Sequence, residues 1–121
     1  MTQENAQALF DKWVSILRLG DWDIRFRWRE PLTECAGQTK LNWVCKQAIV
    51  EIADPNTYKM DMEEFGFDYE YILLHELMHL KMSIIDRNHD DDDMLGAVVH
   101  QIFDEMAKSL VMASRGNAVN A

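Results

Sequence analysis

The stretch that most constrains this chain is the apolar segment 72–80, in which His75, Glu76 and His79 form the pattern His-Glu-x-x-His. On an α-helix, residues four apart lie one turn apart on the same face, so two imidazoles at this spacing can reach one metal ion. The carboxylate after the first histidine then lies beside the metal without ligating it. A general base that takes a proton from metal-activated water stands at that place.

The neighbours of these polar residues are apolar, which predicts that the helix is buried: Leu73, Leu74, Leu77, Met78 and Leu80. Buried polar groups need partners, because leaving them unpaired costs free energy. A metal ion supplies such partners. The simpler alternative is a pair of hydrogen-bonded core histidines with an exposed glutamate.

These residues resemble the signature of the zincin metallopeptidases, which is HExxH on a buried helix. Segment 100–110, which begins with His100, is similar to the terminal helix of small metallopeptidase-like proteins from phages and prophages, where a glutamate typically leads the segment. The resemblance covers most of the chain. It implies a minimal zincin-like domain over 1–121, a bound Zn²⁺, and a peptide or protein substrate that an edge strand aligns.

The motif supplies two ligands, whereas catalytic zinc sites usually have three protein ligands and a water. We expect the third from downstream, with His100 ranked first, Glu105 second and His89 third. A ligand on a second helix packed against the motif helix is the gluzincin arrangement. No glycine lies between His79 and His89, which weakens a metzincin-like site. The alternative for His100 is a hydrogen-bonded helix histidine.

The first half of the chain predicts the helix and sheet of an α+β fold. Thr2 is placed to cap a first helix, and Gly20 is placed to end it in a left-handed conformation. Apolar and charged residues alternate over 22–29, and two further strands are expected over 39–45 and 47–53. The short connections favour antiparallel neighbours, which predicts a mostly antiparallel three-stranded sheet.

Two helices are expected in the second half. Asp68 is a suitable N-cap for the motif helix, which should run to about residue 85. The acidic run 90–93 suits a helix N-terminus better than a calcium loop, because its spacing lacks the calcium pattern. A last helix is expected over 93–113, and its apolar face should contain seven residues: Leu95, Val98, Val99, Ile102, Phe103, Met106 and Leu110.

Composition excludes several classes of protein. The net charge of the 121-residue chain is −9, so a nucleic-acid partner is not expected. The sequence contains no run of about 18 apolar residues, so no membrane span is expected. The first residues also lack the pattern of a secretory signal. We therefore expect a cytoplasmic protein. Cys35 and Cys45 should be free thiols there. The oligomeric state stays open.

Three functions are compatible with these patterns. The first is a zinc-dependent metallopeptidase with Glu76 as general base. The second is a zinc-stabilised binding or regulatory module without turnover. The third is hydrolysis of a non-peptide bond, as in zinc-dependent ribonucleases, against which the acidic charge argues. A peptidase also needs an oxyanion-stabilising side chain, for which there are four candidates: Tyr69, Tyr71, Arg87 and His89.

Overall fold

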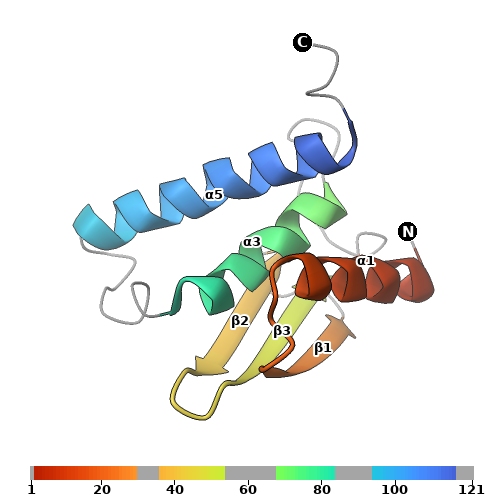
Figure 1. Cartoon of the computed structure of the whole chain (residues 1–121), viewed down its shortest axis with the longest axis horizontal. Helices are drawn as coiled ribbons and strands as arrows, with labels where there is room; N and C mark the ends of the chain where they lie inside the picture. Colours follow the sequence, from red (N-terminus) through yellow and green to blue (C-terminus); the bar gives the residue numbers. More distant parts are fainter. Residues whose placement is uncertain (1, 30–35, 54–67, 84–93, 117–121) are drawn as a thin grey trace.

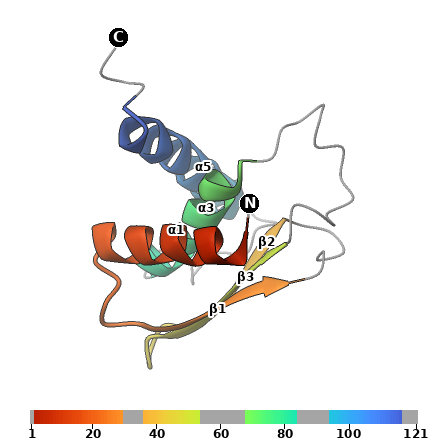
Figure 2. The ribbon, with the colours of Figure 1, turned by 90° about the vertical axis from the view of Figure 1, so that its right-hand side faces the viewer.

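The computed structural model of the chain describes residues 2–29, 36–53, 68–83 and 94–116. These residues form six elements in chain order, which confirms the α+β class: α1 (Gln3–Ile16), β1 (Asp23–Arg29), β2 (Gly37–Asn42), β3 (Gln47–Ala53), α3 (Tyr69–Lys81) and α5 (Met94–Ser114). Helices α1 and α3 lie against one face of the sheet, and α5 lies on α3 on the side away from the sheet (Figures 1 and 2). Helix α3 is therefore enclosed between the sheet and α5.

Helix α1 (Gln3–Ile16) begins where the sequence predicts. The Thr2 hydroxyl accepts a hydrogen bond from the backbone N–H of Asn5 at 3.1 Å, which satisfies one of the free donors at the helix N-terminus. On its buried side, Phe10 stacks on Phe26 with 4.8 Å between ring centroids. This contact fixes the helix against the first strand.

The end of α1 differs from the prediction, because Arg18 and not Gly20 takes the left-handed conformation, with φ 56°. The backbone N–H of Arg18 donates to Ser15, and that of Leu19 donates to Val14. This pair of bonds is the Schellman motif, which closes a helix one residue beyond its C-cap. Leu19 is buried below it, so an apolar contact stabilises the turn that a glycine was expected to make.

The sheet has the order β1-β3-β2, with β3, the last of the described strands, in the centre. Strand β1 (Asp23–Arg29) is parallel to β3 (Gln47–Ala53), and β2 (Gly37–Asn42) is antiparallel to β3. The prediction of a mostly antiparallel sheet is therefore wrong for β1. The connection after β1 leads to the far edge, and β3 then returns between the two earlier strands.

Strand β2 ends three residues before the predicted end at Cys45, and residues 43–46 form the turn of the β2–β3 hairpin. The side chain of Asn42 accepts hydrogen bonds from the backbone N–H groups of Val44 and Cys45. Lys46 adopts a left-handed φ of 52°. Local turn chemistry at Asn42 thus outweighs the strand preference of Val44. Cys45 is a free, exposed cysteine; Cys35 lies outside the described residues.

Helix α3 (Tyr69–Lys81) carries the His-Glu-x-x-His motif. Its predicted N-cap is confirmed, because the Asp68 side chain accepts a hydrogen bond from the backbone N–H of Tyr71 at 3.2 Å. The helix ends at Lys81, earlier than predicted, and residues 84 and 85 lie outside the described part of the chain. The face of the helix toward the core is fully buried, since four leucines are at most 1% exposed: Leu73, Leu74, Leu77 and Leu80.

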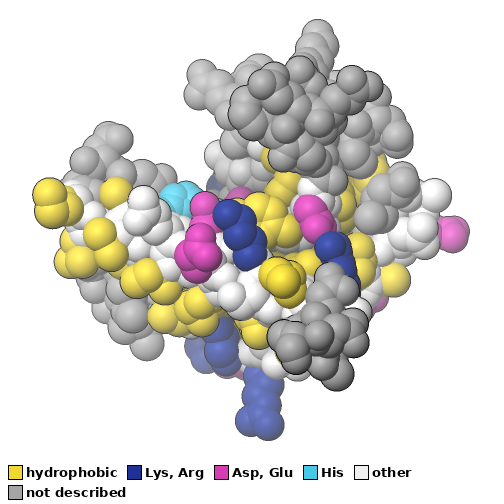
Figure 3. All heavy atoms as spheres, turned by 90° about the horizontal axis from the view of Figure 1, so that it is seen from above, with side chains coloured by type: hydrophobic (Ala, Val, Ile, Leu, Met, Phe, Trp, Pro, Cys, Tyr) yellow, Lys and Arg dark blue, Asp and Glu magenta, His cyan; other side chains and the backbone are white. Residues whose placement is uncertain are grey.

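Helix α5 (Met94–Ser114) matches its predicted limits within a residue, but its buried face differs. The buried residues follow one narrow stripe: Gly96, Val99, Phe103, Ala107 and Val111. Four residues of the predicted apolar face are instead more than a third exposed: Leu95, Val98, Ile102 and Met106. Figure 3, which views the molecule from above in the orientation of Figure 1, shows apolar side chains at the surface. The buried stripe packs against α3, and the second apolar stripe stays at the surface.

A mostly buried carboxylate links the three helices. Glu70 accepts a hydrogen bond from the indole of Trp13 at 2.7 Å and lies 2.9 Å from the ammonium of Lys12. Arg115 donates to the other oxygen of Glu70 at 3.3 Å and binds Asp68 through two nitrogens at 2.7 and 2.8 Å. These contacts join α1, the start of α3 and the end of α5. Within the described residues, none of the helices is long and apolar enough to cross a membrane.

Candidate metal centre

Three histidines from two helices meet between α3 and α5. His75 and His79 come from α3, and His100 comes from α5. One ring nitrogen of each lies within 4.8 Å of those of the other two. Tetrahedral zinc with Zn–N bonds of about 2.1 Å places its donors roughly 3.4 Å apart. The three imidazoles are thus close to the size of a single metal site, and their donor set fits a transition-metal ion.

A carboxylate stands behind the first histidine. Oδ1 of Asp104 lies 2.8 Å from Nδ1 of His75 and accepts a hydrogen bond from the Tyr71 hydroxyl at 2.7 Å. Burial and this bond raise the pKa of Tyr71, which keeps it a donor. Despite its 2.8 Å distance from Asp104, Nδ1 of His75 is buried without a hydrogen bond of good geometry, so Asp104 is a close polar neighbour of the imidazole. Sequence reasoning missed Asp104, although its place four residues after His100 was a signal that both lie on one face of a helix.

The environment of His75 favours the neutral imidazole. Burial lowers the pKa of His75, and the nearby His79 lowers it further, while Asp104 opposes both. Metals bind the neutral form, so this shift favours His75 as a ligand. The ring of His79 packs edge-on against Phe103, with 5.3 Å between centroids. That contact limits how far the second imidazole can turn.

Glu76 points from α3 to strand β2 and is 7% exposed. Its Oε1 accepts a hydrogen bond from the Thr39 hydroxyl at 2.7 Å. Burial raises the pKa of Glu76, although the bond from Thr39 and the nearby His79 and His100 partly offset that effect. The carboxylate thus stands beside the histidine cluster and is held by the sheet. Thr39 is a second residue of the site that the sequence did not reveal.

Strand β2 lies at the edge of the sheet and packs on α3. The backbone N–H of Ala53 donates to the carbonyl of Ala36, which makes these two a hydrogen-bonded pair. Such pairs alternate with non-bonded pairs in an antiparallel ladder. By that alternation and the register of β2, the backbone groups of Gly37, Thr39 and Leu41 turn away from β3. Among the described residues, no strand pairs with that edge.

The remaining predicted site residues do not join the cluster. Glu105 is exposed on α5 and is not part of the three-histidine group. Tyr69 is buried and packs against Trp28, with 5.0 Å between ring centroids. Tyr71 lies beside His75, with its hydroxyl donated to Asp104. Three predicted features lie outside the described residues: His89, Arg87 and the acidic run 90–93.

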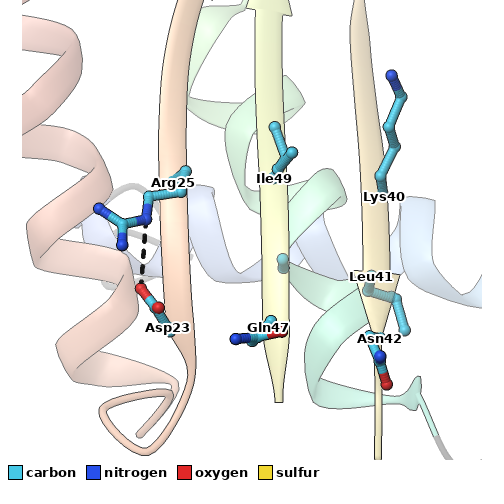
Figure 4. A pocket seen from close by; sticks show the side chains of 8 residues that line it. Asp23, Arg25, Lys40, Leu41, Asn42, Gln47 and Ile49 are labelled. Atoms are coloured by element: carbon cyan, nitrogen blue, oxygen red, sulfur yellow. Dashed lines mark ion pairs between the residues drawn. The ribbon is translucent and has the colours of Figure 1, made fainter. Parts of the chain in front are cut away.

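A shallow concavity of about 390 Å³ lies on the outer face of the sheet (Figure 4). It is lined by side chains such as Arg25 and Lys40, with Ile49 between them, and Nε of Arg25 lies 3.5 Å from Asp23. Arg25 and Arg27 are exposed, as expected for a solvated outer face. A second concavity of about 380 Å³ lies by the hairpin turn. The residues that line these two concavities do not include the histidines of the cluster.

The fold and the cluster define a small α+β protein with a candidate three-histidine metal centre. Compared with known proteins, the chain matches no family model and no curated sequence. The function is therefore inferred from the residues of the site and their geometry.

Proposed function

We propose that the protein is a zinc-dependent metallopeptidase of the zincin type, in which His75, His79 and His100 hold the metal. The observation that carries this proposal is the convergence of three imidazole nitrogens, within 4.8 Å of one another, from two separate helices. If the motif had arisen by chance, there would be no reason to expect a third histidine on the neighbouring helix. The cytoplasmic location expected from the sequence is part of the same proposal.

The donor set favours zinc. Imidazole suits zinc, copper, iron and nickel, whereas magnesium and calcium prefer oxygen ligands. Three protein ligands leave a fourth position for water or substrate, as in catalytic zinc sites. When bound, Zn²⁺ supplies Lewis acidity, which lowers the pKa of water and polarises a carbonyl group.

Glu76 is the general base of the proposed reaction. Its carboxylate adjoins the cluster, and burial raises its pKa, which makes it a stronger proton acceptor. It takes a proton from the attacking water and passes that proton to the leaving amine. Asp104, 2.8 Å from Nδ1 of His75, is the group that would favour a proton on Nδ1 and so offer Nε2 to the metal.

The free edge of β2 supports a peptide as substrate. An extended peptide can add to a sheet edge by main-chain hydrogen bonds, which are independent of its side chains. The backbone groups of Gly37, Thr39 and Leu41 are turned to that edge by the register of the ladder. Because Thr39 also contacts Glu76, a peptide bound there lies next to the base.

The test combines metal content with turnover. Zinc is measured by mass spectrometry on protein purified without a histidine tag, for the wild type and for His75→Ala, His79→Ala and His100→Ala. Glu105→Ala is the matched control, since Glu105 is exposed on the same helix as His100. We expect one zinc per chain in the wild type and the control, and its loss in the three histidine variants. Absence of zinc from the wild type after zinc is supplied overturns the proposal.

Turnover is measured on a quenched-fluorescent peptide library. The wild type should cleave members of the library, and Glu76→Gln should retain zinc but lose at least about 100-fold in kcat, because general bases contribute about 10²–10⁴-fold. Full activity of Glu76→Gln would remove the glutamate from the mechanism.

One observation favours a second candidate, a zinc-stabilised module without turnover. Glu76 is 7% exposed and already bound to Thr39, which is also what a structural carboxylate would show. This candidate expects stoichiometric zinc, no cleavage of the library, and a Glu76→Gln variant changed only in stability. The same two measurements therefore separate the two functions.

A further inference from the structure

We infer that Thr39 and Gly37 of strand β2 are positioning residues that hold the carboxylate of Glu76. The strand that is proposed to bind the peptide would then also position the general base. The inference rests on the proposed function, and it assigns roles to two residues outside the histidine cluster. It follows from one hydrogen bond, one close approach and the register of the strand.

The hydrogen bond fixes one carboxylate oxygen. The Thr39 hydroxyl lies 2.7 Å from Oε1 of Glu76 and 3.2 Å from the backbone carbonyl oxygen of Glu76. A hydroxyl has a single hydrogen to donate, and the shorter distance assigns it to the carboxylate. Threonine is β-branched, which restricts the rotation of its side chain and keeps the hydroxyl directed at Glu76.

The close approach makes room for the other oxygen. A Cβ on Gly37 would lie 3.0 Å from Cγ and 3.1 Å from Oε2 of Glu76. It would also lie 3.1 Å from Cδ1 of Ile52, which is fully buried and has little space to move. Because Gly37 has no side chain, the carboxylate of Glu76 can lie close to the strand at this position. Any larger residue there would displace Glu76.

Both residues act from the same face of the strand. Gly37 and Thr39 are two positions apart, so their side-chain positions face α3 together. Their backbone groups are turned to the free edge at which the peptide is proposed to bind. A peptide on that edge would therefore bond to the same two residues that hold the base. Loss of the Thr39 hydroxyl should then lower kcat more than it raises KM.

The first experiment replaces the hydroxyl. Thr39→Val keeps the branched shape and removes the donor, and we expect kcat to fall about 10- to 100-fold, the effect of losing a hydrogen bond to a charged group. KM, zinc content and Tm should stay close to those of the wild type. Thr39→Ser should restore most of kcat, because it returns the hydroxyl. Gln38→Ala, on the exposed face of the same strand, is the control and should leave kcat unchanged.

The second experiment adds a side chain at position 37. Gly37→Ala should reduce kcat at least as much as Thr39→Val. The matched control is Gly20→Ala, because a Cβ on Gly20 meets nothing within 4 Å. Unchanged kcat in both Thr39→Val and Gly37→Ala, in an enzyme that cleaves peptides, would overturn the inference and leave the proposed function intact.

A readout that needs no turnover completes the test. The carboxyl-carbon NMR resonance of Glu76, identified by its loss in Glu76→Gln, should shift in Thr39→Val and Gly37→Ala and stay in place in the two controls. A resonance that does not respond to either variant shows that β2 does not hold the carboxylate. A wild-type protein that cleaves no peptide overturns the proposed function, and the NMR result still decides whether β2 positions Glu76.

Discussion

Nδ1 of His75 lies 2.8 Å from Oδ1 of Asp104, so a carboxylate of α5 contacts a histidine of α3 while another residue of α5, His100, faces the same cluster. Helix α5 therefore contributes both the third imidazole and a carboxylate beside the first. The assembly of the centre depends on the packing of these two helices against each other.

Asp104→Ala should weaken zinc binding about 10- to 100-fold, the usual effect of removing the carboxylate behind a metal-ligating histidine. Zinc affinity is measured by competition with a chelating dye. Glu105→Ala, one residue along the helix and exposed, should bind zinc like the wild type. Equal affinities in both variants would show that Asp104 does not support the site.

Zinc should stabilise the fold, because an ion at the proposed site would join α3 to α5 and would bind the folded state alone. At a free zinc concentration 100 times Kd the gain is about 2.7 kcal/mol, which should raise Tm by roughly 10 °C or more. Calorimetry with zinc and with a chelator measures the shift. His100→Ala should show almost no shift, and an equal shift in that variant would place the metal elsewhere.

Stability should fall in acid because of Asp68 and Glu70. The bonds from Arg115 lower the pKa of Asp68. Burial of Glu70 raises its pKa, but the bonds from Lys12 and Trp13 outweigh burial, so the pKa of Glu70 is also lowered. Folded-state pKa values below the unfolded ones mean that the unfolded chain binds more protons in acid, so stability is present above about pH 4–5 and is lost below it.

The check is Tm as a function of pH for the wild type and for Arg115→Met. The variant removes the main partner of Asp68, so its Tm should be lower at neutral pH and should fall less steeply between about pH 5 and pH 3. Parallel curves for the two proteins would contradict the assignment of this acid sensitivity to the Arg115 contacts.

The two apolar stripes of α5 should respond very differently to truncation. Phe103 is 1% exposed against α3, and Phe103→Ala should cost about 3–5 kcal/mol of unfolding free energy. Ile102, its neighbour in sequence, is 47% exposed, and Ile102→Ala should cost less than about 1 kcal/mol. Denaturant unfolding measures both values. Similar losses in the two variants would mean that the outer stripe is covered.

Local features of the chain were predictable from the sequence. Thr2 and Asp68 cap their helices through hydrogen bonds to residues three positions along, a range that a sequence pattern displays directly. The motif histidines share a helix face for the same reason. His100 was ranked first among the third ligands because a helix that packs on the motif helix can present it, and α5 does bring it to the pair.

Contacts between distant segments were not predictable in this way. Thr39 and Glu76 meet only because β2 is the edge strand that packs on α3, and strand order is set by the whole sheet. Helix α5 has apolar residues on two sides, so periodicity alone could not choose the stripe containing Phe103 over the one containing Ile102. The left-handed residue at the end of α1 is Arg18 and not the expected Gly20, because the buried Leu19 determines where the helix closes.

The order of the strands has a consequence for how the chain reaches this structure in time. The β2–β3 hairpin closes over the short turn 43–46, whereas Asp23 of β1 must find Gln47 across the whole intervening hairpin. Closing the larger loop costs more chain entropy, so β1 should join a hairpin that has already formed. During synthesis β1 leaves the ribosome first, but it cannot pair until β3 has been made. Destabilising changes in the hairpin should therefore slow folding, and those in β1 should mainly speed unfolding.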